Sequence, residues 1–347
     1  MKAGIVGVRH WHVGEYVRCL RACEVEIVGV TDRVMEAAEQ WAEALGCRAF
    51  TTSEALIRAT HPDLLFAQGP HVEMTEMVQE LLHHKIPFLV EKPAGLDWRQ
   101  LADLAHQAGN LWAGVDLPLR AMPLISRLVE LRVQGLLGRV NHFHHRLIAG
   151  GPERYRQWQV PWMLDPDQAG GGALINFGPH GLDLLLLLWD DEVATVYAQT
   201  SQRSYGERVE DDAIICCTGR EGALGVVEVG YLNADDHYER DLLLSTDRLF
   251  LTTDRLHEAT WRWRKLANVK DHASPELEGL SDVSSSYGED FFLAFVQESL
   301  RRLRVGQPPI ASLWDMTAVL RLLNAAQASA KRGKPVRLPQ NWRKSMS

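Results

Sequence analysis

Cysteine is scarce in this sequence. Its 347 residues include five cysteines, an odd number that does not suit a disulfide framework. Cys216 and Cys217 are adjacent, so in a strand their side chains would point to opposite faces. We therefore expect reduced cysteines and a cytoplasmic protein.

Long apolar runs and an excess of basic residues are missing as well. The longest apolar run, 184–189, is far shorter than the roughly 20 residues that a membrane helix needs, and Met1 and Lys2 lead directly into an apolar stretch without a signal-peptide pattern. Lysine and arginine number 37 against 45 aspartates and glutamates, a net charge of −8. Because nucleic acids are bound by basic faces, we expect neither a membrane nor a nucleic acid as a partner.

The chain is long enough for two domains, and its pattern changes near residue 118. Before that point, short apolar runs alternate with helical patterns, which predicts βαβ units and a parallel sheet of the doubly wound, nucleotide-binding type. The expected strands are 3–8, 25–30, 63–67, 86–90 and 111–115, and the expected helices are 13–23, 35–45, 71–84 and 96–108.

The second part has a different order. Strand patterns follow one another without helices between them, which is typical of an antiparallel sheet in a mixed α/β domain. The expected strands are 192–200, 212–218, 224–232, 241–245 and 249–252, and the expected helices are 122–134, 173–189, 288–304 and 313–331. A polar surface loop is expected at 281–286, and the alternating stretch 261–265 is expected to be a sheet face.

The loop after the first strand is short of glycine. A dinucleotide-binding loop reads G-x-G-x-x-G, but the frame that starts at Gly7 has Arg9 and His12 at the second and third glycine. Gly7 can still make the tight turn. The Arg9 side chain either contacts the phosphates of a dinucleotide or folds outward into solvent. His12 either separates the helix from the strand or lines the pocket. His10 lies between these two residues.

Residues that follow strands are the next candidates, because ligands of parallel sheets bind at the carboxyl ends of the strands. Asp32 follows the second strand and can bind a ribose 2′-hydroxyl, which favours NAD, or it can simply cap the next helix. Arg33 beside it can pair with a 2′-phosphate, so NADP stays possible. Glu91, Lys92 and Pro93 follow a later strand.

Lysine at a strand end can orient a hydroxyl, or lose its proton where its pKa is lowered. A cis Lys92–Pro93 bond would be one way to aim it. The alternative is an exposed turn between a strand and a helix.

A helix that begins with three glycines carries polar residues on one face. Asn176, His180 and Asp183 recur at helical spacing in the leucine-rich stretch 170–189. His180 can act as a general acid or base, or it can be a core histidine with satisfied hydrogen bonds. His142 and His144 share one face of an expected strand but have no evident third ligand, so we predict surface or interface histidines and no metal site.

In their order and spacing these motifs resemble the Gfo/Idh/MocA oxidoreductases over nearly the whole chain. The resemblance rests on the first loop, on "EKP" at 91–93, on "GVDLPLRAMP" at 114–123, on "GGGALINFGPHGLD" at 170–183 and on the tail 306–339. It implies an α/β fold with a Rossmann dinucleotide-binding domain at 1–118. The second domain, 119–347, would be an α/β domain for substrate binding and oligomerisation, with an open, mostly antiparallel sheet.

The resemblance also implies site residues. Lys92 matches the lysine that binds the reacting hydroxyl, and His180 matches the proton-transfer histidine. Asn176 stands where many members have aspartate, so it can orient a group but cannot accept a proton. His71 and Met74 replace the family's usual asparagine and histidine. The expected cofactor-binding residues are Gly7, Arg9, His10, His12, Asp32, Arg33, Pro70, His71, Glu91 and Lys92. The expected substrate-binding residues are Lys92, Arg120, Trp162, Asn176 and His180.

The function implied is NAD(P)-dependent hydride transfer at a hydroxyl or keto carbon of a sugar, a polyol or a related compound. Two alternatives remain: an NAD-dependent glycosidase of the same family, and a non-catalytic protein that senses sugar and dinucleotide. NAD is the expected cofactor. A homodimer or homotetramer through the C-terminal sheet is the expected assembly.

Overall fold

The computed structural model describes residues 1–234, 237–254, 258–263 and 290–342, and it divides the chain into two compact units. The first unit comprises Met1–Pro118, Glu153–Gly171 and Phe292–Leu320. The second unit comprises Leu119–Pro152, Gly172–Phe291 and Arg321–Ser347. The expected helix residues 288–289, the expected loop 281–286 and residues 264–265 lie outside the described residues.

The chain leaves the first unit where the sequence predicts a boundary, but it then returns twice. One reason lies at the edge strand of the first sheet, where the Val115 N–H donates to the carbonyl oxygen of Ala311 at 3.0 Å. A second lies at the first loop, where the Trp162 indole donates to the carbonyl of Arg9 at 2.9 Å. Both contacts satisfy backbone groups over long distances in sequence, which a single boundary at 118 does not anticipate.

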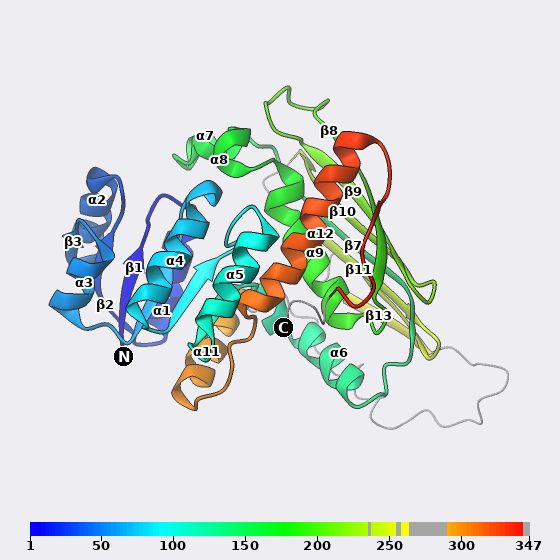
Figure 1. The fold of residues 1–347 in the computed structure, drawn as a ribbon, viewed down its shortest axis with the longest axis horizontal. Coiled ribbons are helices and arrows are strands. Elements are labelled where there is room, and N and C mark those ends of the chain that lie inside the picture. The colour runs from blue at the N-terminus through cyan, green and yellow to red at the C-terminus, as the bar shows by residue number, and fades with distance from the viewer. Residues whose placement is uncertain (235–236, 255–257, 264–289, 343–347) are drawn as a thin grey trace. The chain divides into compact units, whose positions relative to one another are not determined.

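The first unit contains a six-stranded parallel sheet in the order β3-β2-β1-β4-β5-β6 (Figure 1). Its order reverses between β1 and β4, and such a reversal opens a ligand crevice at the carboxyl ends of the strands. The strands are β1 Lys2–Val6, β2 Glu26–Thr31, β3 Arg48–Phe50, β4 Leu64–Ala67, β5 Phe88–Glu91 and β6 Ala113–Asp116. The helices are α1 Val13–Ala22, α2 Met35–Leu45, α3 Ser53–Thr60, α4 Met74–His84, α5 Trp98–Ala108, the short α7 Arg154–Gln157 and α8 Pro166–Ala169, and α11 Phe291–Arg304.

The predicted strands and helices of this unit are present near their expected bounds. The sequence analysis missed β3 and α3, because β3 has only three residues and carries no periodic signal. The expected helix 71–84 begins as a 3₁₀ turn, His71–Glu73, before α4.

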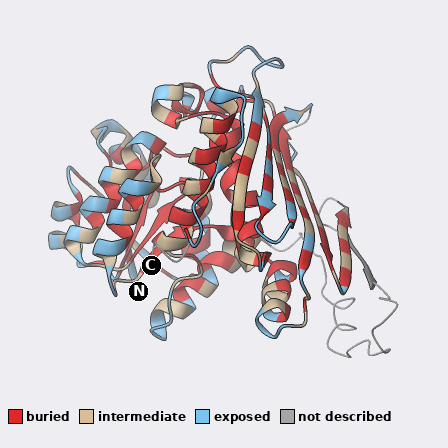
Figure 2. Cartoon of the chain, turned by 45° about the vertical axis from the view of Figure 1, so that its right-hand side comes forward, coloured by how far each residue is buried: buried red, intermediate tan, exposed pale blue. Residues whose placement is uncertain are grey.

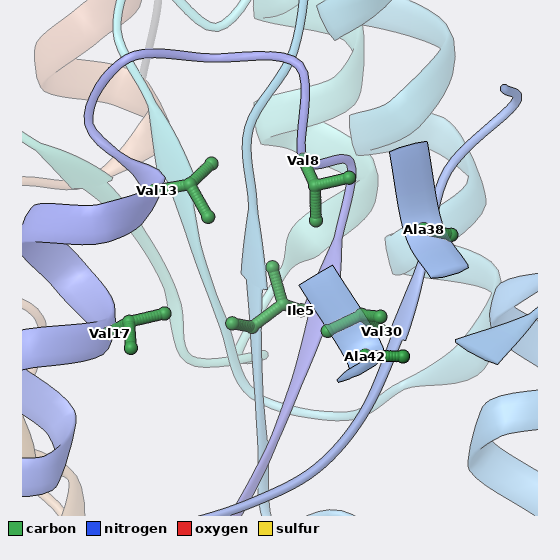
Figure 3. Packing of buried hydrophobic residues seen from close by; sticks show 7 residues of the cluster. All are labelled: Ile5, Val8, Val13, Val17, Val30, Ala38 and Ala42. Carbon is green, nitrogen blue, oxygen red and sulfur yellow. The ribbon is translucent and has the colours of Figure 1, made fainter. Parts of the chain in front are cut away.

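A cluster of buried apolar residues beside the first loop stabilises the strand–loop–helix unit at the start of the chain. Figure 3 shows apolar side chains of β1, the loop after it, α1, β2 and α2 converging. They are Ile5, Val8, Val13, Val17, Val30, Ala38 and Ala42. β4 and β5 are buried at every residue, as expected for parallel strands that are covered on both faces.

The second unit contains an eight-stranded sheet in the order β13-β12-β11-β7-β10-β9-β8-β14. Among the described strands only β7 and β10 pair in parallel, and the other pairs are antiparallel. The expected fold class, with its mostly antiparallel second sheet, is confirmed. The strands are β7 Val140–Gly150, β8 Val193–Ser201, β9 Asp212–Gly219, β10 Leu224–Asn233, β11 Glu239–Thr246, β12 Leu249–Asp254, β13 Glu258–Trp263 and β14 Val336–Arg337.

One helix, α9 Ala173–Leu188, packs against β10, β7 and β9 and forms the centre of this unit. The stretch Pro166–Leu188 is long and apolar enough to cross a membrane by length and composition alone, yet 89% of its most apolar window is buried inside the protein. A predominantly apolar helix that is mostly buried belongs to the core of a protein. The other helices are α6 Pro123–Val133 and α12 Leu313–Arg332, the latter divided between the two units.

Burial alternates along the strands of the second sheet, as the alternating colours of Figure 2 show. On β10, Val227 and Val229 are buried, and a Cβ added to Gly225 would meet Leu185 and Trp189 of the α9 region. The neighbouring residues, such as Leu224, point to the opposite face of the sheet.

Candidate active site

A pocket of about 210 Å³ lies in the first unit at the carboxyl ends of β1, β2 and β4. Its position matches the crevice that the strand order predicts. It is lined by Val6, Gly7, Arg9, Thr31, Asp32, Arg33, Thr51, Thr52, Ser53, Gln68, Glu73, Met77 and Glu80. Four of the expected cofactor-binding residues, Gly7, Arg9, Asp32 and Arg33, are therefore brought together.

Asp32 is at the centre of a hydrogen-bond network in this pocket. Its carboxylate accepts from the backbone N–H groups of Val8 and Val34, both at 2.8 Å, and from Arg9 Nε at 2.6 Å. The other side of the Arg9 guanidinium donates to Glu73 at 2.7 Å. Asp32 thus holds the turn before α2 and also lines the pocket.

The same network shows what replaces the second glycine. The Arg9 side chain folds into the pocket toward Asp32 and Glu73. Arg33 is more exposed and pairs with Glu76 at 2.6 Å, with Glu73 3.8 Å away. The pocket lining therefore carries two arginines against the carboxylates of Asp32, Glu73 and Glu80.

Gly7 keeps the role expected of the first glycine. Its φ is +80°, and a Cβ there would lie 1.8 Å from the carbonyl oxygen of Gln68, so no other residue fits. The Gln68 side chain is fully buried, lines the pocket and has no hydrogen-bond partner among the described residues for its amide oxygen or nitrogen. Its only signal in the sequence was its place directly after β4.

Lys92 follows β5 and is 1% exposed. Burial lowers the pKa of Lys92 to about 8, against the opposing effect of Glu91. Its Nζ lies 5.5 Å from the centroid of the Trp11 ring. The Lys92–Pro93 bond is cis, as the sequence suggested.

Glu91 connects Lys92 to the first loop. One carboxylate oxygen accepts from the Lys92 backbone N–H at 3.2 Å, and the other lies 3.1 Å from Nδ1 of His12. His12, in place of the third glycine, therefore lines this site. Asp116 is the register partner of Glu91 on β6, and burial together with the Glu91 charge raises its pKa well above the usual value.

Aromatic and imidazole rings surround this lysine within the first unit. His10 stacks on Trp11 with a centroid separation of 3.8 Å. Trp162 lies 6.0 Å from His10 and 5.0 Å from His71, centroid to centroid. Nδ1 of His71 is 2.8 Å from the carbonyl of Ala169. The segment Glu153–Gly171 thus brings the predicted residue Trp162 to the predicted residues His10 and His71, with Pro70 immediately before the latter.

Three of these side chains resemble a metal-binding set, since His10, His12 and Glu91 each place one possible ligand atom within 4.8 Å of the others. The hydrogen bonds argue against that use. Nδ1 of His10 accepts from the His12 N–H at 3.1 Å, so in the neutral ring Nε2 carries the proton and has no lone pair for a metal.

The second unit presents the polar face of α9. The helix is continuous through Pro179, so Asn176, His180 and Asp183 share a face as expected. The Asn176 amide donates to the Tyr231 hydroxyl at 3.2 Å. Arg120, which was expected to bind substrate, forms an ion pair with Asp183, and its Nε donates to one carboxylate oxygen at 2.9 Å. His180 is half-buried.

The glycines before α9 allow the close approach that the sequence suggested. A Cβ on Gly172 would lie 2.0 Å from the carbonyl oxygen of Glu210. The Glu210 carboxylate accepts from the N–H groups of Gly172 at 2.7 Å and Leu174 at 3.1 Å, which caps the helix. The expected catalytic roles of Lys92, His180 and Asn176 remain predictions.

The residues of the first unit fit a dinucleotide. The tight turn at Gly7, the carboxylate of Asp32 and the unpartnered buried amide of Gln68 offer the backbone approach and hydrogen bonds that such a ligand needs.

Comparisons with known proteins agree with this geometry. A family model described as an oxidoreductase family with an NAD-binding Rossmann fold matches residues 1–113, and a model of the Gfo/Idh/MocA C-terminal domain matches residues 125–250. The fold and site thus define an NAD-binding oxidoreductase. The chain belongs to the Gfo/Idh/MocA family.

Individual relatives are distant. The rhizopine catabolism protein MocA of Rhizobium meliloti is 26% identical over 216 residues, which span 59% of this chain and 63% of that protein. The WlbA dehydrogenase of Bordetella pertussis, solved with NADH and UDP-GlcNAcA, has a TM-score of 0.81 at 20% identity, with 98% of each chain covered. GenD2 of gentamicin A biosynthesis, solved with NAD, has a TM-score of 0.78 at 21% identity, with 98% and 96% covered.

Proposed function

We propose that this protein is an NAD-dependent dehydrogenase that oxidises a hydroxyl-bearing carbon of a sugar, a polyol or a related compound. The observation that carries the proposal is the buried Lys92, whose pKa is lowered to about 8, at the end of β5 in the same unit as the Asp32 pocket. A lysine in that state can hold and polarise a hydroxyl at neutral pH.

The reaction divides between the cofactor and the protein. NAD, when bound, would supply the hydride acceptor for the carbon that bears the hydroxyl. Lys92 binds and polarises that hydroxyl, and His180 takes its proton. Asn176 cannot ionise, so it orients the substrate or the histidine through its amide.

NAD is favoured over NADP because carboxylates neutralise the arginines of the pocket. Arg9 is held by Asp32 and Glu73, and Arg33 by Glu76. A 2′-phosphate would meet the Asp32 carboxylate and would find no unpaired guanidinium among these two residues.

The first experiment is a binding titration with NAD⁺, NADH, NADP⁺ and NADPH, followed by a screen of polyols and sugars for NADH formation. We expect binding of the NAD pair and turnover that Lys92→Ala abolishes without loss of the circular dichroism spectrum. Turnover in the Lys92→Ala variant would remove this lysine from the mechanism.

The same assays separate the alternatives. A glycosidase would release product from a glycoside with no net change in NADH. A sensor would bind NAD and sugar without turnover. Either result would contradict a dehydrogenase.

A further inference from the structure

Two buried imidazoles in the first unit each have one nitrogen without a partner. His10 is 3% exposed and His71 is 1% exposed. Nε2 of each ring has no hydrogen-bond partner among the residues that the structure describes. Buried polar atoms are rarely left unpaired in native proteins, so two in one place indicate a ligand.

The partners of the other ring nitrogens determine what each Nε2 can do. Nδ1 of His71 faces the carbonyl of Ala169, which can only accept, so Nδ1 carries the proton and Nε2 is an acceptor. Nδ1 of His10 faces the backbone N–H of His12, which can only donate, so Nε2 of His10 carries the proton and is a donor.

Both rings are neutral at physiological pH. Burial lowers the pKa of His71 to about 3, with a further contribution from Lys92. Burial also lowers the pKa of His10 well below its usual value, and the neighbouring His12, Lys92 and His71 lower it further. The two nitrogens therefore form a neutral donor–acceptor pair beside Lys92.

The position of His10 and His71 in the sheet indicates which part of the cofactor they would contact. Asp32 marks the adenosine end of the crevice, on the β2 side of the reversal between β1 and β4. His71 follows β4 and Lys92 follows β5, on the other side. The nicotinamide end belongs there, because the hydride must pass to the ring from the carbon whose hydroxyl Lys92 binds.

We propose that His10 and His71 bind the carboxamide of the nicotinamide, with His10 Nε2–H donating to the amide oxygen and His71 Nε2 accepting from the amide nitrogen. This inference rests on the proposed NAD-dependent function. A carboxamide is neutral and carries one acceptor oxygen and one donor NH₂, which complements the pair. The Trp162 ring lies beside both histidines, 6.0 Å from His10 and 5.0 Å from His71 between centroids.

Conservative variants test Nε2 of His10 and Nε2 of His71 separately. In His71→Asn the amide can still donate to Ala169 in place of Nδ1, but no group reaches the Nε2 position. In His71→Gln the longer amide restores an acceptor there. His10→Asn keeps an acceptor for the His12 N–H and removes the donor. The exposed His83 on α4 provides the matched control, His83→Asn.

The probes are NAD⁺ and its 3-acetylpyridine analogue, in which a methyl group replaces the amide NH₂, with dissociation constants measured by calorimetry. We expect the wild-type protein to prefer NAD⁺ over the analogue by about tenfold, the usual size of one lost buried hydrogen bond. His71→Asn should abolish that preference, and His71→Gln should restore it. His10→Asn should weaken both dinucleotides by about tenfold, because both keep the carbonyl.

Three results would overturn the inference: a full preference for NAD⁺ in His71→Asn, wild-type affinity for both dinucleotides in His10→Asn, or an equal loss in His83→Asn. A wild-type protein that binds neither dinucleotide would instead refute the proposed function, and the inference with it. The two failures are thus distinguishable, and neither measurement depends on turnover.

Discussion

At the scale of single residues, burial changes the acid–base chemistry of Lys92. Burial lowers its pKa to about 8, so the neutral amine becomes the major form as the pH rises through 8. We expect the acetylation rate of Lys92 to reach half its maximum near pH 8, as measured by competitive labelling and mass spectrometry.

The exposed Lys85 at the end of α4 is the internal control, and its labelling curve should not coincide with that of Lys92. Coincident labelling curves for Lys85 and Lys92 would contradict the lowered pKa.

Glu73 is the residue that we expect to set cofactor preference together with Asp32. It accepts from Arg9 at 2.7 Å and lies 3.8 Å from Arg33. Glu73→Gln leaves both guanidiniums with less negative charge around them, which favours a 2′-phosphate. The ratio of the dissociation constants of NADPH and NADH should fall by about tenfold, roughly 1.4 kcal/mol.

Fluorescence titration of both reduced cofactors measures that ratio. Glu39→Gln changes the net charge by the same amount at an exposed site on α2 and should leave the ratio unchanged. An unchanged ratio in Glu73→Gln would mean that Asp32 alone excludes the phosphate.

The site residues that could be predicted were those that follow a strand. Asp32 and Lys92 are examples, because the end of an apolar run marks the binding edge of a parallel sheet. Gln68 was marked for inspection by its place after a strand, although no binding role was predicted for it, and Glu73 was not predicted as a site residue because it lies in no motif. Glu73 reaches Arg9 across 64 positions in the sequence, and no local pattern reports such a contact.

At the scale of elements, the packing of α9 on β7 buries a histidine that the mechanism does not use. His145 is fully buried, and neither of its ring nitrogens has a hydrogen-bond partner among the described residues. A Cβ on Gly181 of α9 would lie 2.9 Å from its Nδ1. Burial lowers the pKa of His145 to about 3.

The lowered pKa of His145 predicts how the stability of the folded protein depends on pH. Between about pH 6.5 and pH 3 the unfolded chain binds a proton at this residue and the folded chain does not, so stability is lost as the pH falls through 6.5. His145→Leu removes the two unpaired ring nitrogens and the protonation equilibrium of the imidazole. We expect the free energy of unfolding to rise by about 1–2 kcal/mol at pH 7, and by more at pH 5.

Urea unfolding at both pH values measures the change. His142→Leu, on the half-exposed face of the same strand, should shift stability by less than about 0.5 kcal/mol. A His145→Leu protein that is less stable than the wild type at pH 5 would show that the imidazole has a stabilising partner.

At the scale of the whole molecule, the second sheet has one face without a helix among the described residues of its unit. Ile214 and Leu224 on this face are 45% and 51% exposed, although α9 packs on the opposite face. His144, Arg146 and Glu228 lie on the same face, half-exposed. Such a face is suited to a second copy of the chain.

We expect a homodimer or homotetramer through this surface. The double variant Ile214→Glu and Leu224→Glu should sediment as a monomer at micromolar concentration, because four carboxylates would meet in a paired interface. Val133→Glu, at an 82% exposed site on α6, is the control and should keep the wild-type mass. A wild-type monomer in sedimentation velocity would refute the assembly.

The sequence by itself determined the order of the elements, the fold class and the strand ends that carry Asp32 and Lys92. These depend on local periodicity and on the rule that ligands bind at the carboxyl ends of parallel strands. Only the tertiary structure decided that Arg9 turns toward Glu73, that His71 faces Ala169, and that Glu153–Gly171 rejoins the first unit. These contacts join residues far apart in the chain, and they form because buried polar groups must find partners that no local pattern specifies.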